Sequence, residues 1–177
     1  MIELLRELRS HFDGMEDRLL AFSKYGFQAE GWLKTELITW LDAAQEHGRL
    51  ARVQREIPTE SRKKVDLAID LDDERNWIEL KHWLVGKQAG QTFRAGFYFG
   101  DDAGFGLHRD AEKLVSTTSS GGLWILVLVT ANPGEAEWME GIQKYHAKFH
   151  GPQVVSRSNP RAFPSHYCLG LFEVVRK

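Results

Sequence analysis

Three charged residues near the middle of the chain have the types and spacing needed for chemistry on phosphate esters. Asp66 lies in the apolar segment 65–69, and Glu79 and Lys81 lie two positions apart in the segment 77–84. Side chains two apart in a strand share one face of a sheet, so Glu79 and Lys81 are expected on the same face. If a short turn pairs the two segments as strands, Asp66 and Glu79 converge.

Two converging carboxylates repel each other unless a cation lies between them. Oxygen ligands favour Mg²⁺ or Mn²⁺ over zinc, so Asp66 and Glu79 are predicted to be metal ligands. The Lys81 ammonium could orient a water or stabilise charge that develops on a phosphoryl oxygen. This combination is typical of metal-assisted hydrolysis of a phosphodiester. The alternative is a solvated sheet face that carries an ordinary ion pair.

Other polar residues are expected close to this group. Asp110 and Lys113, on a predicted helix, could orient Lys81 or a metal-bound water, although an ion pair within that helix is the default interpretation. His82 alternates with Lys81 along the strand, so it is expected to point away from the site as a satisfied histidine.

Hydrophobic periodicity predicts the elements that must position these residues. Helical spacing of apolar side chains predicts helices at 2–21, 28–47, 107–119 and 136–149. Alternating or continuous apolar runs predict strands at 51–57, 65–69, 77–84, 123–129 and 167–175. Short turns join the first three strands and favour an antiparallel meander. A helix precedes the strand 123–129, so this strand is expected to be parallel to a neighbour.

This order, α-α-β-β-β-α-β-α-β, together with Val65-Asp66 and Glu79-Leu80-Lys81, resembles the PD-(D/E)XK nuclease superfamily, which has the restriction-endonuclease-like fold. Residues 28–130 reproduce the core order of the family, and Val65 stands where the name-giving proline would be. The resemblance implies an α/β fold with a mixed central sheet flanked by helices. It further implies a single domain over 1–177, with an added N-terminal helix and a C-terminal α-β extension.

The resemblance also implies a function. It indicates a Mg²⁺-dependent (or Mn²⁺-dependent) endonuclease or exonuclease that hydrolyses phosphodiester bonds in DNA, with RNA as an open alternative. Asp66 and Glu79 then bind the metal, and Lys81 assists the water or the phosphate. A second interpretation is a catalytically inactive nuclease fold that binds nucleic acid or serves as a scaffold subunit of a larger complex. A homodimer or a partner subunit is compatible with both.

Members of the superfamily often carry one more acid on the helix before the strands, and Glu36 and Glu30 are the candidates. Both lie inside the apolar arc of the predicted helix 28–47, where a carboxylate is costly without a partner. Glu36 is preferred as the acid that positions metal or water, because it lies in mid-helix and closer in sequence to the strands. Glu30, near the helix start, is the alternative; a favourable interaction with the helix dipole is the other explanation for an acid at that position.

Basic residues around the predicted site could contact the phosphates of a nucleic acid. They lie just before the strand of Asp66 or in the loop after Lys81, and they are Arg62, Lys63, Lys64, Lys87 and Arg94. A solvated turn is an equally weighted alternative.

Composition sets the limits within which these hypotheses must fit. The chain has 177 residues, 42% apolar and 11% aromatic, which excludes intrinsic disorder and a coiled-coil rod. Its single cysteine, Cys168, excludes an internal disulfide framework and a cysteine-rich zinc site. The net charge of −2 does not indicate nucleic-acid binding, but binding needs only a local basic patch. The longest apolar run, 123–129, is too short to span a bilayer and no targeting segment is visible, so a cytoplasmic protein without a membrane partner is expected.

Overall fold

The computed structural model describes residues 1–49, 52–58, 64–88, 91–93, 98–99, 106–117, 120–130, 139–141, 143, 156–157 and 167–176. Its N-terminal part forms helices α1 (Ile2–Asp13), α2 (Glu16–Tyr25) and α3 (Glu30–Glu46). The single helix predicted over 2–21 is therefore two helices. The break falls after α1 at Gly14, where glycine lowers helix stability, and Leu19 of α2 is still fully buried.

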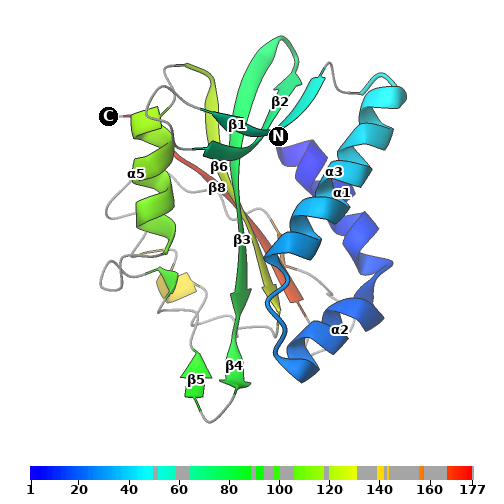
Figure 1. Cartoon of the computed structure of the whole chain (residues 1–177), viewed down its shortest axis with the longest axis vertical. Helices are drawn as coiled ribbons and strands as arrows, with labels where there is room; N and C mark the ends of the chain where they lie inside the picture. The colour runs from blue at the N-terminus through cyan, green and yellow to red at the C-terminus, as the bar shows by residue number, and fades with distance from the viewer. Residues whose placement is uncertain are drawn as a thin grey trace.

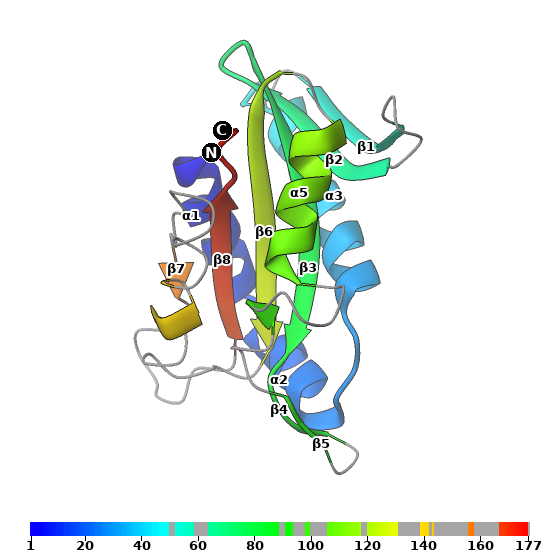
Figure 2. The same cartoon turned by 90° about the vertical axis from the view of Figure 1, so that its left-hand side faces the viewer.

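The central sheet has the strand order β1-β2-β3-β6-β8-β7 within the described residues. Its strands are β1 (Arg52–Pro58), β2 (Lys64–Leu71), β3 (Glu74–Leu84), β6 (Gly122–Thr130), β7 (Ser156–Arg157) and β8 (Tyr167–Glu173). The first three form the predicted antiparallel meander, and β6 is parallel to β3, as predicted. Figure 2 shows β8, β6 and β3 side by side. Strands β4 (Gly86–Gln88) and β5 (Gln91–Phe93) pair as a separate hairpin.

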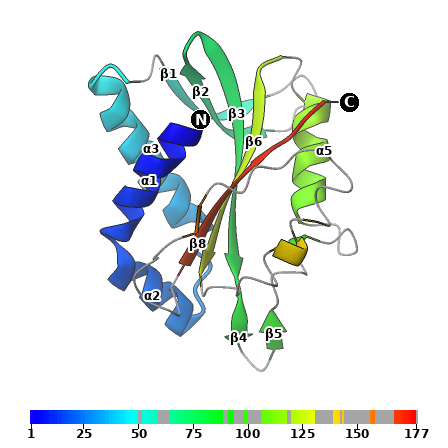
Figure 3. The same cartoon turned by 180° about the vertical axis from the view of Figure 1, so that it is seen from behind.

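Helices cover both faces of this sheet. Helices α1, α2 and α3 lie on one face and α5 (Leu107–Thr117) lies on the other, as Figure 1 and the view from behind in Figure 3 show. Strand β3 contributes to the cores on both faces, because its side chains alternate. Ile78 and Leu80 pack under α1–α3, whereas Trp83 packs under α5. The mixed α/β class with a helix-flanked mixed sheet is confirmed, and the restriction-endonuclease-like identity of the fold stays a prediction.

The C-terminal elements agree with the sequence where they are described. The helix predicted at 107–119 is α5, and the last strand is β8. Of the helix predicted at 136–149, residues 139–141 and 143 are described, and they are helical. Within the described ranges, none of the helices has the length and apolar character needed to cross a membrane.

Candidate active site

Asp66 lies where β2 parts from β3. The pairing of these strands extends from the turn as far as Leu67 opposite Ile78 and stops there. One residue further, Asp66 Oδ2 accepts a hydrogen bond from the Leu80 backbone N–H at 3.0 Å. The carboxylate thus supplies the acceptor that the departing strand no longer offers, and only 17% of the side chain is exposed. We call the place defined by Asp66, Glu79 and Leu80 the β2–β3 fork.

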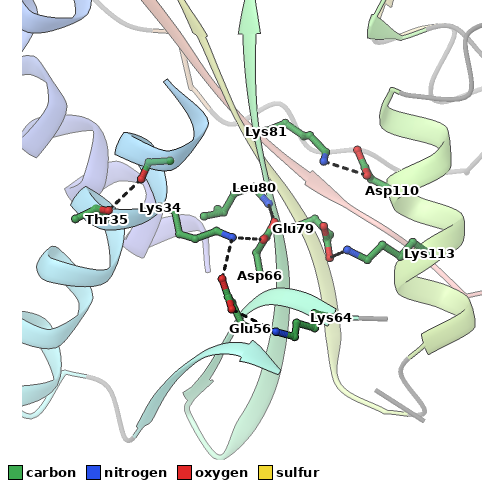
Figure 4. A network of polar contacts seen from close by, with 11 residues as sticks. Lys34, Thr35, Glu56, Lys64, Asp66, Glu79, Leu80, Lys81, Asp110 and Lys113 are labelled. Carbon is green, nitrogen blue, oxygen red and sulfur yellow. Dashed lines mark hydrogen bonds and ion pairs between the residues drawn. The ribbon is translucent and has the colours of Figure 1, made fainter. Parts of the chain in front are cut away.

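Glu79 and Lys81 share one face of β3, as predicted, and α5 covers that face. Lys113 Nζ of α5 lies 2.6 Å from Glu79 Oε1, and Lys81 Nζ lies 3.3 Å from Asp110 Oδ1 of the same helix. Figure 4 shows these two ion pairs crossing from β3 to α5. Asp110 and Lys113 therefore reach across to the sheet, which the default interpretation of an ion pair within the helix did not anticipate.

Lys34 of α3 approaches the fork from the other side of the sheet. Its Nζ lies 2.7 Å from Asp66 Oδ1 and 3.9 Å from Glu56 Oε1 of β1 (Figure 4). Glu56 Oε2 in turn lies 3.5 Å from Lys64 Nζ. Glu56 has φ +47°, a left-handed conformation that side-chain-bearing residues rarely adopt. Such backbone strain costs about 1–3 kcal/mol and persists only where surrounding contacts hold it.

The charges at the fork alter one another's ionisation. Burial raises the pKa of Glu79 to about 7, against the opposing effect of Lys113, and the nearby Asp66 charge adds to the rise. Burial also works to raise the pKa of Asp66, but the Lys34 and Leu80 hydrogen bonds outweigh it and hold this pKa below its ordinary value. Asp66 is therefore ionised at neutral pH, whereas Glu79 titrates near neutrality.

Lys81 keeps its charge although most of it is buried. Burial works to lower its pKa, but the carboxylates of Asp110, Glu30 and Glu79 raise it above the ordinary lysine value. The pKa of Asp110 is itself raised, chiefly by burial. Asp110 Oδ2 is buried with no hydrogen-bond partner among the described residues, so Asp110 is held at the site mainly by its ion pair with Lys81.

Glu36, the acid preferred from the sequence, does not reach the fork. Its Oε1 lies 2.8 Å from His11 Nε2 of α1, and its Oε2 lies 3.8 Å from Arg18 of α2. Lys34, two residues earlier, contacts Asp66 instead. Two residues of an α-helix turn by roughly 200°, so Lys34 and Glu36 face opposite sides of α3.

Glu30, the alternative helix acid, is the one the structure brings near the site. It precedes Lys34 by four residues and so lies on the same face of α3. Its exposed carboxylate interacts electrostatically with Lys34, Lys81 and Asp110. The structure thus places Glu30, and not Glu36, where its charge acts on the site, and the role of either acid stays a prediction.

His82 points away from the site, as predicted, and ties the start of α3 to β3. Its Nδ1 accepts a hydrogen bond from the Ala29 backbone N–H at 3.0 Å, and its Nε2 lies 2.8 Å from Thr130 Oγ1. Because Nδ1 accepts, the ring is neutral and donates its Nε2 proton to Thr130. Ala29 directly precedes Glu30, so this buried histidine fixes the end of α3 that carries the acid.

The predicted phosphate-contacting residues are placed only in part. Lys64 is exposed and pairs with Glu56, and the backbone of Lys87 lies in β4 opposite Thr92. Arg62, Lys63 and Arg94 lie outside the described residues. Contact of these five residues with nucleic acid stays a prediction.

The donor set at the fork suits a hard cation, but ammonium groups already accompany it. No group of three or more His, Cys, Asp or Glu side chains in the described part of the chain is arranged to hold a metal. Mg²⁺ needs only one or two carboxylates, completed by water and substrate phosphates. Asp66 and Glu79 supply such oxygens by type, and Lys34 and Lys113 lie against them. Asp66 and Glu79 are therefore the residues that could hold Mg²⁺ or Mn²⁺, and in this structure Lys34 and Lys113 contact their oxygens.

Sequence patterns did not identify two charged residues that the structure places at the β2–β3 fork, Lys34 and Glu56. The sequence contains a weak indication of Lys34, because it follows the candidate acid Glu30 by about one helical turn. Glu56 had none, because its role depends on a left-handed backbone that its residue type does not favour.

Comparison of the chain with protein-family models, with curated proteins and with solved structures found no match. The function must therefore be inferred from the charged cluster at the β2–β3 fork.

Proposed function

We propose that this chain is a metal-dependent nuclease that hydrolyses phosphodiester bonds in DNA. The observation that supports the proposal is that Asp66, Glu79 and Lys81 act on one another electrostatically at the place where β2 parts from β3, with Asp66 hydrogen-bonded to the Leu80 N–H between the other two. It agrees with the resemblance of Val65-Asp66 and Glu79-Leu80-Lys81 to the PD-(D/E)XK nucleases. Glu30 from α3 adds the helix acid that this family often carries.

Each residue then has a distinct part in hydrolysis. Asp66 and Glu79 would hold Mg²⁺ or Mn²⁺, and a bound ion would supply polarisation of the scissile phosphate. The Lys81 ammonium stabilises the charge that develops on a phosphoryl oxygen or orients the attacking water. Asp110 is a positioning residue, because its carboxylate holds Lys81 at 3.3 Å and keeps that lysine charged.

The test is a cleavage assay on the purified full chain. Single-stranded, duplex and branched DNA and RNA are each incubated with EDTA, Mg²⁺ or Mn²⁺. We expect cutting that needs the metal and falls about a hundredfold or more in Lys81→Met, in line with the loss of one charge-stabilising group. Lys24→Met, on the exposed end of α2, is the matched control and should cut like the natural chain. Equal cutting by the Lys81 and Lys24 variants would remove the site assignment.

One observation favours the second candidate function, a catalytically inactive nucleic-acid-binding or scaffold subunit. Asp66, Glu79 and Lys81 each already have an oppositely charged partner, so the charges balance without a metal. A scaffold of this kind should bind nucleic acid with a log-linear dependence on salt, bind no Mn²⁺ in calorimetry, and cut none of the substrates.

A further inference from the structure

Lys34 lies beside two carboxylates from different strands, and a third acid, on its own helix, acts on it electrostatically. Asp66 of β2 is 2.7 Å from its ammonium, Glu56 of β1 is 3.9 Å away, and Glu30 of α3 acts on it electrostatically. Carboxylates that converge in this way repel one another unless a cation is present. Among the described residues, Lys34 is the cation that contacts both Asp66 and Glu56. Of those two carboxylates, Lys64 contacts only Glu56, and Lys81 acts on Asp66 electrostatically.

The backbone of β1 is distorted at the residue that completes this arrangement. The β1–β2 ladder pairs Arg55 with Leu67 and Ile57 with Val65, so Glu56 is the residue opposite Asp66. Its left-handed φ of +47° is unfavourable for a residue with a side chain, and its carboxylate lies between the two lysines. The strained residue therefore helps to keep the Lys34 ammonium beside Asp66.

Asp66 does not depend on Lys34 alone for its negative charge. The Leu80 N–H donates to its second oxygen, and that bond remains when the lysine is removed. Glu79 differs, because it is 2% exposed and Lys113 is the cation that contacts it. Removing Lys113 would leave a buried, uncompensated acid that takes up a proton instead. Lys34 is therefore the residue at which displacement by a metal can be tested cleanly.

We propose that Lys34 is the resident cation of the metal-free site, so that a divalent metal binds Asp66 only by displacing the Lys34 ammonium. The inference rests on the proposed function, since that function assigns the metal to Asp66. A metal bound at Asp66 and an ammonium 2.7 Å from the same carboxylate compete for one place. The natural lysine thus weakens metal binding, and a neutral side chain of similar length strengthens it.

The experiment is a calorimetric titration of Mn²⁺ into the full chain and two variants at neutral pH. Lys34→Met removes the competing charge and keeps a good helix former in α3. Lys64→Met is the matched control, because it removes a positive charge next to Glu56 but has no ion pair with Asp66. We expect Mn²⁺ to bind about fivefold more tightly to Lys34→Met than to the natural chain, with a change below about twofold in the control.

The outcomes separate this inference from the proposed function. Tighter binding in Lys34→Met alone, or binding that appears only in that variant, supports the resident lysine. Equal or weaker binding in Lys34→Met, when the natural chain binds Mn²⁺, overturns the lysine's role and leaves the metal site standing. Absence of Mn²⁺ binding in all three proteins overturns both. Thermal melts confirm folding, and Lys34→Gln replaces Lys34→Met if the latter does not fold.

Discussion

The two carboxylates at the fork differ sharply in how they are stabilised. Asp66 receives a backbone N–H and a lysine ammonium, which together hold its pKa low. Glu79 is almost completely enclosed, and burial raises its pKa to about 7 despite Lys113. Desolvation therefore outweighs the ion pair at Glu79, whereas hydrogen bonding outweighs desolvation at Asp66.

Because the pKa of Glu79 is raised, we expect Glu79→Gln, which cannot ionise, to stabilise the chain at high pH but not at low pH. A folded-state pKa above the ordinary 4.5 contributes stability that is complete below pH 4.5 and is lost as the pH rises through about 7. At pH 8, Glu79→Gln should therefore be more stable than the natural chain, by about 3 kcal/mol from the size of this shift. At pH 4 the two should be equally stable.

Urea unfolding at the two pH values measures this difference. Glu46→Gln, at the exposed end of α3, is the control and should change the free energy of unfolding by less than about 0.5 kcal/mol. A Glu79 variant that is less stable than the natural chain at pH 8 would mean that the Lys113 ion pair outweighs burial.

At the scale of secondary-structure elements, one buried histidine sets the position of α3 relative to β3. His82 follows Lys81 directly in β3, and its ring bonds Ala29 at the start of α3 and Thr130 at the end of β6. The His82 side chain therefore links β3, α3 and β6, although it points away from the β2–β3 fork. Burial lowers the pKa of His82 to about 4, so the folded chain holds it neutral.

The lowered pKa of His82 predicts acid sensitivity. A folded-state pKa below the ordinary 6.5 contributes stability that is present above pH 6.5 and is lost as the pH falls toward 4. His82→Gln keeps an acceptor for Ala29 and a donor for Thr130 but does not titrate. The free energy of unfolding of the natural chain should fall relative to His82→Gln between pH 7.5 and 5, by about 2 kcal/mol.

Urea titrations at both pH values measure that fall, and any change common to both proteins comes from other groups. A constant difference between the two proteins across this range would show that His82 does not titrate on unfolding there.

For the whole molecule, the sheet separates two hydrophobic cores that share strand β3. Leu33 lies in the core beneath α1–α3, and Leu114 lies in the core beneath α5, both fully buried. Strand β3 pairs with β2 on one side and β6 on the other, so neither core can lose its order without disturbing the common strand.

This sharing predicts a single cooperative unfolding transition. Leu33→Ala and Leu114→Ala should each lower the midpoint of that transition, with a cost of about 2–5 kcal/mol for a fully buried leucine. Far-ultraviolet circular dichroism and tryptophan fluorescence should give coincident curves in both variants. Two separated transitions in either variant would indicate that the cores unfold independently and that the chain is not one domain.

The motif residues and the strand meander could be predicted because both depend on local pattern. Period-two alternation correctly placed Glu79 and Lys81 on one face and His82 on the other. The positions of Glu36 and Glu30 relative to the site could not be predicted, because helical periodicity puts both in the apolar arc of the segment 28–47. In the structure, His11 and Arg18 come from other helices and pair with Glu36.

Local sequence patterns were enough to predict the α/β class, the order β1-β2-β3-α5-β6-β8 and the strands that carry Asp66, Glu79 and Lys81, but not the division of α1 from α2 or the short strands β4, β5 and β7. The predicted features follow from hydrophobic period and turn residues, which act over short distances along the chain. Which charged side chains pair with one another depends on the packing of distant segments. Lys34 and Lys113 approach the fork from helices on opposite faces of the sheet, and Glu56 joins them through a strained backbone. Such partnerships depend on packing between distant segments, and no local pattern encodes them.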